Sequence, residues 1–331
     1  MKKAFIAALV TLAFLCSSGS PVGAQVNRQD SCEIADKSGI PTYEWCEPDS
    51  SPKAVAILMH GLTQEGRSVE ALAQQLASDN YLVLSLDQRG HGRWHFGDKH
   101  LAVKANYTGT VDDLLRVCHT VKASYPHLQL FCVGESAGSA VVAQAAARDP
   151  SVIDGIVLCS PGTCPRVYNP VWVLSDFFCN IYRLDHPIDL RRYINKYASE
   201  DRRITDEMLS DPMCRYKMSG REILGTLRLI WHTRKAVKDL PDDMPLLVVQ
   251  GGRDHILAPF TASLLVHSAR STSKKLVVLP KLGHVLMGTA LIKPVVSNTI
   301  TTWLDSRVQT GSAAISVAGQ LANSVRPETT P

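Results

Sequence analysis

The chain has 331 residues, of which 45% are hydrophobic and 20% are charged, and its formal net charge is +4. This length suits one large domain, or one domain with an insertion, and the hydrophobic content is sufficient for a substantial core. The mild positive charge does not indicate a nucleic-acid-binding protein, so we expect no nucleic acid among the partners.

The N-terminus has the pattern of an export signal. Two lysines precede an apolar run from Ala4 to Leu15, and small residues up to Ala24 follow it. The run is too short to cross a bilayer, which takes about 20 residues. We therefore expect cleavage near Ala24 and export to the periplasm or out of the cell. Lipid attachment at Cys16 is the alternative, although Leu15 stands where a small residue is normally found.

Cleavage near Ala24 would remove Cys16, one of the nine cysteines. The remainder is an even number, which indicates disulfide bonds in an exported protein. Two pairs are candidates because each would brace one region: Cys32 with Cys46, and Cys179 with Cys214. By contrast, Cys132 and Cys159 lie in predicted core strands, where we expect buried thiols that act as small apolar residues.

Short apolar segments alternate with helical patterns along most of the chain. The predicted strands are Pro41–Trp45, Ala54–Met59, Tyr81–Leu86, Leu128–Val133, Gly155–Cys159, Leu246–Gln250 and Lys275–Leu279. The predicted helices are Val69–Ser78, Val111–Ser124, Ala137–Arg148 and Ala290–Trp303. Strands that are apolar throughout are typical of a parallel sheet with helices on both faces. The fold class is therefore α/β.

The alternation breaks between Gly162 and Leu240, a stretch too long for a loop in a compact domain. Helical patterns recur within it, at Val171–Ile181, Thr205–Leu209 and Glu222–Val237. We interpret the stretch as an inserted helical cap that covers a site at the carboxyl ends of the strands. Between Arg183 and Lys238 it carries 13 Lys and Arg residues but 8 Asp and Glu residues. This excess is typical of a solvated face, or of a surface that meets anionic lipid headgroups or anionic substrates.

These patterns divide the chain into five parts. We expect a signal peptide (1–24), the first part of the core (25–162), the cap (163–240), the second part of the core (241–308) and a flexible tail (309–331). The tail is rich in Ser, Thr, Ala and Gln and has little apolar surface to bury.

Residues 134–138 read Gly-Glu-Ser-Ala-Gly and fit the pattern G-x-S-x-G. A buried strand leads into the motif and a helix leads out, which places Ser136 on a sharp turn with its hydroxyl exposed. Gly134 and Gly138 are needed where the strand and the helix nearly touch. The helix N-terminus below Ser136 favours developing negative charge. The motif predicts a nucleophilic serine.

A serine nucleophile needs a base, and the base needs a carboxylate to orient it. On this kind of sheet the order along the chain is serine, acid, histidine. Asp254 follows one predicted strand and His284 follows the next, so both should lie at the sheet edge that carries Ser136. His255 is an alternative base, but it adjoins the acid and its reach to Ser136 would be poor.

A tetrahedral intermediate also needs two hydrogen-bond donors for its oxyanion. We expect the backbone N–H groups of Ala137, which follows the nucleophile, and of Leu62, in the loop after the strand Ala54–Met59. His60 in the same loop is expected to form structural hydrogen bonds.

Five motifs together resemble the α/β-hydrolase fold: His60-Gly61, Asp87-Gln88-Arg89-Gly90-His91-Gly92, Gly134-Glu135-Ser136-Ala137-Gly138, Gln250-Gly251-Gly252-Arg253-Asp254 and Gly283-His284. Within that fold the chain is similar, from about residue 40 to 305, to the monoacylglycerol lipase and lysophospholipase group, which is related to the serine aminopeptidases. The resemblance implies cleavage of acyl esters through an acyl-enzyme, without a cofactor. The export signal, the cysteines of the cap and the basic cap depart from that group's pattern.

The predicted function is hydrolysis of carboxylic esters of a lipid or acylglycerol type by Ser136, His284 and Asp254. The expected partners are a small ester or lipid substrate and, peripherally, an anionic membrane surface. Three alternatives remain: an exported aminopeptidase or amidase of the same fold, a thioesterase or other acyl transferase, and a non-catalytic binding protein of the cell envelope. The imidazoles of His91, His95 and His100 and the carboxylate of Asp98 suggest a metal site. They fall in or near the loop that matches the family, and no metal is expected.

Overall fold

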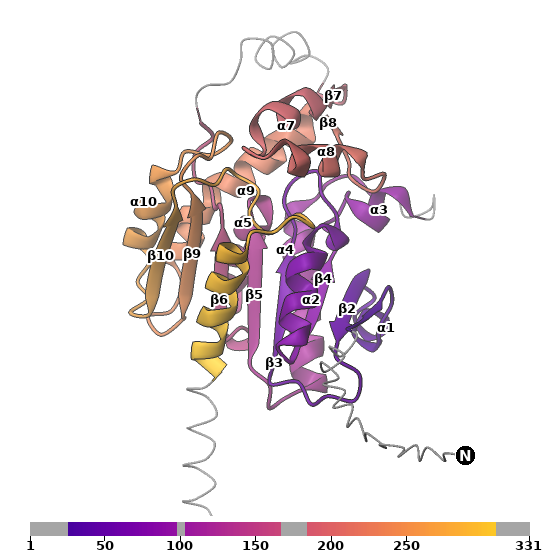
Figure 1. Ribbon diagram of the computed structural model, residues 1–331, viewed down its shortest axis with the longest axis vertical. Helices are drawn as coiled ribbons and strands as arrows, with labels where there is room; N and C mark the ends of the chain where they lie inside the picture. Colours follow the sequence, from indigo (N-terminus) through magenta and orange to yellow (C-terminus); the bar gives the residue numbers. More distant parts are fainter. Residues whose placement is uncertain (1–25, 98–102, 167–183, 309–331) are drawn as a thin grey trace, which may run out of the picture.

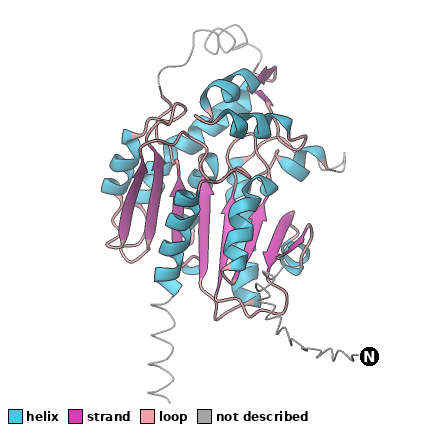
Figure 2. Cartoon of the chain, viewed as in Figure 1, coloured by secondary structure: helices cyan, strands magenta, loops and turns pink. Residues whose placement is uncertain are grey.

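The computed structural model describes residues 26–97, 103–166 and 184–308. Its centre is an eight-stranded sheet with helices on both faces (Figures 1 and 2). The second strand runs antiparallel to both of its neighbours in the sheet, and the six strands from the third onward are parallel to one another. In spatial order the strands are β1 (Asn27–Gln29), β2 (Thr42–Cys46), β4 (Tyr81–Leu86), β3 (Ala54–Met59), β5 (Leu130–Glu135), β6 (Gly155–Cys159), β9 (Leu246–Gly251) and β10 (Lys274–Leu279). The predicted α/β class and mostly parallel sheet are confirmed.

Two helical layers cover the sheet. One consists of α2 (Glu70–Ser78), which the short helix η1 (Gly66–Val69) precedes, and of helical residues 294–308. The other consists of α1 (Glu33–Ser38), α4 (Tyr107–Ser124), α5 (Ala137–Arg148), α9 (Gly220–Lys238) and α10 (Phe260–Ser268). Two short helices, α3 (Gly92–Phe96) and η3 (Pro150–Val152), lie in connections. Each layer buries an apolar stripe on the sheet, which gives the core its two halves.

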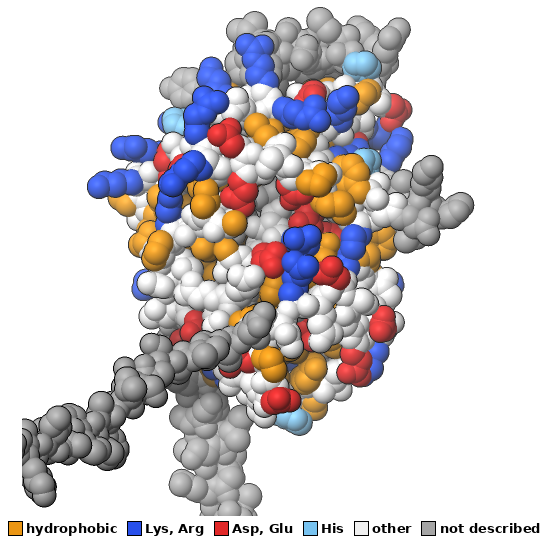
Figure 3. Space-filling view, turned by 45° about the vertical axis from the view of Figure 1, so that its right-hand side comes forward, with side chains coloured by type: hydrophobic (Ala, Val, Ile, Leu, Met, Phe, Trp, Pro, Cys, Tyr) orange, Lys and Arg blue, Asp and Glu red, His pale blue; other side chains and the backbone are white. Residues whose placement is uncertain are grey.

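The cap lies above the carboxyl ends of the parallel strands (Figure 1). It contains β7 (Pro187–Asp189), α7 (Arg191–Tyr197), α8 (Arg202–Ser210) and β8 (Lys217–Ser219), and β7 and β8 form an antiparallel ribbon. Its small core is made of Ile194, Ala198, Ile204, Met208, Cys214, Tyr216 and Val285. Lys and Arg side chains gather over this upper part of the molecule (Figure 3).

Two of the predicted cap helices need separate comment, because one lies outside the described residues and the other packs on the core. The piece Val171–Ile181 lies outside the described residues, as do the predicted signal peptide and tail. The piece Glu222–Val237 corresponds to α9, which packs along α5 and also contacts α10. This helix therefore joins the cap to the helical layer of the core. In the part of the chain that the structure describes, no helix combines the length and apolarity needed to span a membrane.

A buried ion pair fastens the cap to the core. Both guanidinium nitrogens Nη1 and Nη2 of Arg215 donate to Glu222, at 2.8 and 2.9 Å. The same carboxylate accepts hydrogen bonds from the backbone of Ala105 and from the N–H and hydroxyl of Ser219, each at 2.9 Å. Arg215 also donates to the carbonyl of Gly90 at 3.0 Å. The pair thus connects the start of α9 and the cap with the loops before and after α3.

Replacement Glu222→Gln is expected to destabilise the fold by about 3 kcal/mol at neutral pH, because it leaves Arg215 buried without a countercharge. Burial alone would raise the pKa of Glu222, but the hydrogen bonds from Arg215, Ala105 and Ser219 lower it to about 2. The stabilisation is therefore complete above the unfolded-state pKa, about 4.3, and is lost as the pH falls through the folded-state value. Urea unfolding at pH 7 and pH 3 measures the difference between wild type and variant.

The difference should shrink at pH 3, and Asp243→Asn, at an exposed carboxylate after α9, should change little at either pH. An equal loss of stability at both pH values would contradict a charge-based role for Glu222.

The cysteines only partly follow the predictions. Cys132 and Cys159 are fully buried thiols, as predicted. The predicted Cys32–Cys46 disulfide is wrong in this structure, in which both cysteines are free. The sulfur of Cys32 instead caps α1 by accepting the N–H of Ala35 at 3.4 Å. The partner predicted for Cys214, Cys179, lies outside the described residues.

Candidate active site

Ser136 sits on the turn between β5 and α5 with φ 55° and ψ −115°. A positive φ is rare for a residue with a side chain and costs about 1–3 kcal/mol. A Cβ on Gly134 would overlap the backbone of Gly138, and a Cβ on Gly138 would overlap the carbonyl of Met59. The two glycines therefore allow the close approach of strands and helix that holds the strained serine in place.

The structure brings Ser136, His284 and Asp254 together. The Oγ of Ser136 lies 2.8 Å from Nε2 of His284, and Nδ1 of His284 lies 2.7 Å from Oδ2 of Asp254. Asp254 follows β9, and His284 follows β10. Both side chains are almost completely buried, with residue exposures of 4% for His284 and 0% for Asp254. Three separate loops at one edge of the sheet thus form a chain of hydrogen bonds from hydroxyl to imidazole to carboxylate.

The surroundings of Asp254 keep it ionised. Its Oδ1 accepts the N–H groups of Ile256 and Leu257, both at 2.9 Å, and its Oδ2 accepts Nε2 of Gln250 at 3.1 Å. Burial alone would raise the pKa of Asp254, but the charge of His284 and these hydrogen bonds lower it overall. For His284, burial acts in the opposite direction and lowers the pKa. The neighbouring Asp254 more than compensates, so the pKa of His284 is raised overall. The pair favours the tautomer with the proton on Nδ1 and a free Nε2 facing Ser136.

A buried carboxylate below the site holds the loop that carries His284. Glu135, in the second position of the serine motif, accepts the N–H groups of Leu286, Met287 and Gly288 at 2.6, 2.8 and 3.0 Å. Burial raises the pKa of Glu135, although these hydrogen bonds oppose the shift. We did not assign this residue a role from the sequence. The available signal was an acidic residue at the end of an otherwise apolar, buried strand.

The cap holds the same loop from above. Glu200 accepts the N–H of Gly283 at 2.5 Å, directly before His284. Glu207 accepts the hydroxyl of Thr289 and the N–H of Ala290, both at 2.6 Å. The position of the histidine therefore depends on the cap as well as on the sheet.

The two predicted oxyanion donors lie in the turn after β5 and in the loop after β3. Ala137 is the first residue of α5, so its N–H has no acceptor one turn earlier in the helix. Leu62 follows Gly61, where a Cβ would lie 3.6 Å from the Cβ of Ser136. The loop after β3 thus runs beside the nucleophile. The roles of Ala137 and Leu62 as oxyanion donors stay a prediction, with Ala137 next to the serine in sequence and Leu62 in the loop beside it.

His60 shapes the same loop from within. It is fully buried, its Nε2 accepts the N–H of Gln88 at 3.0 Å, and its Nδ1 lies 2.7 Å from the carbonyl of Gly61. Burial lowers the pKa of His60, which favours the neutral ring that this pattern of one donor and one acceptor needs. These contacts are those of the structural histidine that the sequence suggested.

The structure does not support His255 as the base, and it describes only two of the four residues of the metal hypothesis. His255 is exposed, and its Nδ1 lies 3.3 Å from Nη1 of Arg166. Asp98 and His100 lie outside the described residues, and His91 is buried against the ring of His60. Within residues 26–97, 103–166 and 184–308, no group of three or more His, Cys, Asp or Glu side chains is arranged to hold a metal ion.

Comparison with known proteins gives consistent matches. Residues 50–289 match the family described as "Serine aminopeptidase, S33". The monoglyceride lipase of Rattus norvegicus is 28% identical over 281 residues, which cover 82% of this chain and 89% of the relative. The monoacylglycerol lipase of Mycolicibacterium smegmatis is 26% identical over 274 residues, which cover 80% and 93%.

A solved structure, a soluble variant of monoglyceride lipase from Saccharomyces cerevisiae in complex with a substrate analog, superposes with a TM-score of 0.67 at 18% identity. The superposition covers 82% of this chain and 92% of the yeast chain, and at this identity it establishes the fold. The family match spans most of the chain and includes every candidate site residue. The chain therefore belongs to the serine aminopeptidase S33 family and has the α/β-hydrolase fold, in the monoacylglycerol lipase-like group.

Proposed function

We propose that this protein is a serine hydrolase that cleaves carboxylic esters of a lipid or acylglycerol type through an acyl-enzyme. The observation that carries the proposal is the hydrogen-bonded chain from Ser136 through His284 to Asp254. The named activities of the rat and mycobacterial relatives support an ester substrate. The three side chains and the two backbone N–H groups proposed for this reaction can carry it out without a cofactor.

In the proposed reaction, Oγ of Ser136 attacks the acyl carbonyl while Nε2 of His284 takes its proton. The N–H groups of Leu62 and Ala137 stabilise the resulting oxyanion. His284 then gives the proton to the departing alcohol, which leaves an acyl ester on Ser136. Water, deprotonated by His284, hydrolyses that ester and releases the acid. Asp254 keeps the imidazole oriented and stabilises its positive charge throughout.

The test is covalent labelling with a fluorophosphonate probe. Wild type should be labelled, whereas Ser136→Ala should remain unlabelled and lose about 10⁶-fold in kcat on a p-nitrophenyl ester. Ser263→Ala, at an exposed serine of α10, is the matched control and should behave as wild type. Labelling that persists in Ser136→Ala would show that another residue is the nucleophile.

A substrate series then separates the remaining functions. We expect turnover of p-nitrophenyl and monoacylglycerol esters and little or none of aminoacyl-anilides. Turnover confined to anilides would make the protein an aminopeptidase or amidase. Absence of both labelling and turnover would favour the non-catalytic binding protein, whereas labelling without turnover of either class would favour a thioesterase or other acyl transferase.

A further inference from the structure

The outer face of α9 carries an unusual apolar stripe. Leu224, Leu227 and Trp231 are 41%, 39% and 78% exposed, respectively. Their spacing of three and four residues places them on one side of the helix. The opposite side of α9 is already buried on the core through Leu229 and Val237. The exposed stripe is therefore not needed to attach α9 to the described part of the chain.

The neighbouring helix also exposes apolar side chains. Phe260 and Leu264 of α10 are 67% and 44% exposed and lie one helical turn apart. α9 and α10 contact each other and cover the same face of the sheet. We call the five residues Leu224, Leu227, Trp231, Phe260 and Leu264 the docking face. Large apolar side chains exposed on two contacting helices are a candidate surface for binding a partner.

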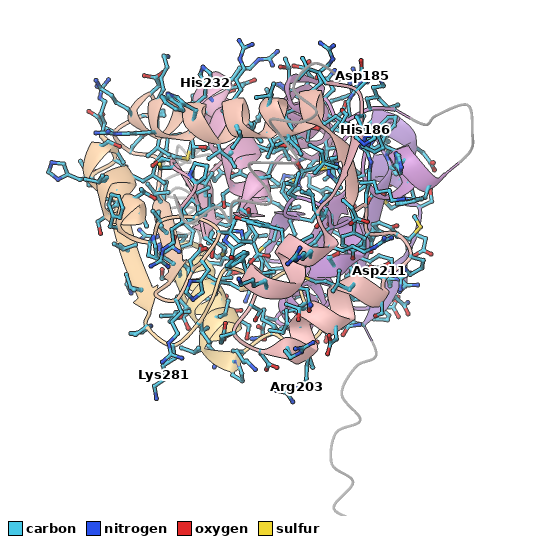
Figure 4. All side chains as sticks on the ribbon, turned by 90° about the horizontal axis from the view of Figure 1, so that it is seen from above. Asp185, His186, Arg203, Asp211, His232 and Lys281 are labelled. Atoms are coloured by element: carbon cyan, nitrogen blue, oxygen red, sulfur yellow. The ribbon has the colours of Figure 1, made fainter. Side chains whose placement is uncertain are left out.

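Basic side chains border the stripe along α9. Arg228 and Lys235 lie on one side of it, Arg234 lies on the other, and Lys238 continues it by about two turns. The one acidic residue of α9, Glu222, is buried in its ion pair with Arg215. Viewed from above, side chains with terminal nitrogen atoms project outward along α9, near His232, and away from the core (Figure 4). Lys235 pairs with Asp239 at 2.6 Å, and with Arg228, Arg234 and Lys238 the border of the docking face keeps a net positive charge.

We propose that the docking face binds the surface of an anionic phospholipid bilayer. Exposed Trp, Leu and Phe side chains bordered by Lys and Arg are the pattern of helices that lie in the membrane interface. Tryptophan is favoured at the depth of the headgroups, and anionic headgroups attract the adjoining basic side chains. A second copy docked on the same face would instead bring two positive borders together. The charge of the border therefore favours a membrane over a dimer.

The test is sedimentation of the full chain with vesicles of phosphatidylcholine and phosphatidylglycerol. All proteins carry Ser136→Ala so that lipid hydrolysis cannot interfere, which also makes the result independent of the proposed function. Leu227→Ser/Trp231→Ser and Arg228→Glu/Arg234→Glu should each bind at least about tenfold more weakly than the parent. The parent should bind phosphatidylcholine vesicles much more weakly, and added salt should weaken its binding to the anionic vesicles.

Matched controls distinguish this face from general surface effects. Leu291→Ser/Val295→Ser removes side chains that are 37% and 50% exposed outside α9 and α10, and Lys275→Glu/Lys281→Glu reverses two exposed charges outside these helices. Both should bind as the parent does. Undiminished binding by the docking-face variants, or an equal loss in the controls, would overturn the proposal. Self-association that Leu227→Ser/Trp231→Ser abolishes, without vesicle binding by the parent, would identify a dimer interface instead.

Discussion

Replacing Asp254 by Asn should lower kcat for ester hydrolysis by about 10⁴-fold while leaving the fold intact. The amide is nearly the same size as the carboxylate and can keep the hydrogen bonds from Ile256 and Leu257, both 2.9 Å in wild type. It cannot stabilise the imidazolium of His284, and its NH₂ group favours the tautomer in which Nε2 carries the proton. That tautomer cannot accept a proton from Ser136. Steady-state kinetics with a soluble p-nitrophenyl ester measure the loss.

The pH profile of the same variant gives a second readout. His284 must be neutral to act as a base, so wild-type kcat/KM should fall as the pH drops through its raised pKa. Burial alone lowers this pKa, and Asp254 is the main group that raises it. Removing that charge should therefore shift the acid limb to lower pH.

Asp206→Asn, at an exposed carboxylate of α8, should leave both kcat and the pH profile unchanged. A variant Asp254→Asn with nearly wild-type kcat would mean that another group orients His284, or that His284 is not the base.

Replacing Glu135 by Gln should lower kcat by about 100-fold, since small misplacements of a catalytic group have effects of this size. The carboxylate accepts three consecutive N–H groups of the loop after His284. An amide has one acceptor oxygen, and its NH₂ group would face backbone donors. The loop should then shift and carry His284 with it. The charge of Glu135 also contributes to the raised pKa of His284, so the acid limb of the variant should move to lower pH.

A purely structural role for Glu135 predicts a different outcome. It would lower the free energy of unfolding but leave kcat and the pH profile of the folded enzyme as they are. Rates should therefore be measured well below the unfolding temperature of the variant. Glu33→Gln, at an exposed residue of α1, is the matched control and should change neither quantity. Wild-type kinetics in Glu135→Gln would rule out a positioning role.

Local patterns in the sequence were sufficient for several elements of the core. The ranges of β3, β4, β6 and α5 agree with the prediction at both ends. An apolar run buried on both faces identifies a parallel strand without knowledge of its neighbours, and Asp149-Pro150 marks the end of α5. β1 is a short, exposed edge strand without an apolar pattern, and α10 has apolar residues on both its buried and its exposed sides. Neither offered the periodicity on which the prediction depends.

The sequence by itself also determined the candidate nucleophile, acid and base, because chain order and strand ends constrain where they lie on an α/β sheet. Only the tertiary structure decided what surrounds them. The hydrogen bonds that Glu135 accepts from residues 286–288 join parts of the chain separated by more than 150 residues. The hydrogen bond that Glu222 accepts from Ala105 spans 117 residues. The tertiary structure also decided that Cys32 caps a helix and does not form a disulfide with Cys46. Such contacts depend on the relative placement of packed elements, which no local pattern of residues encodes.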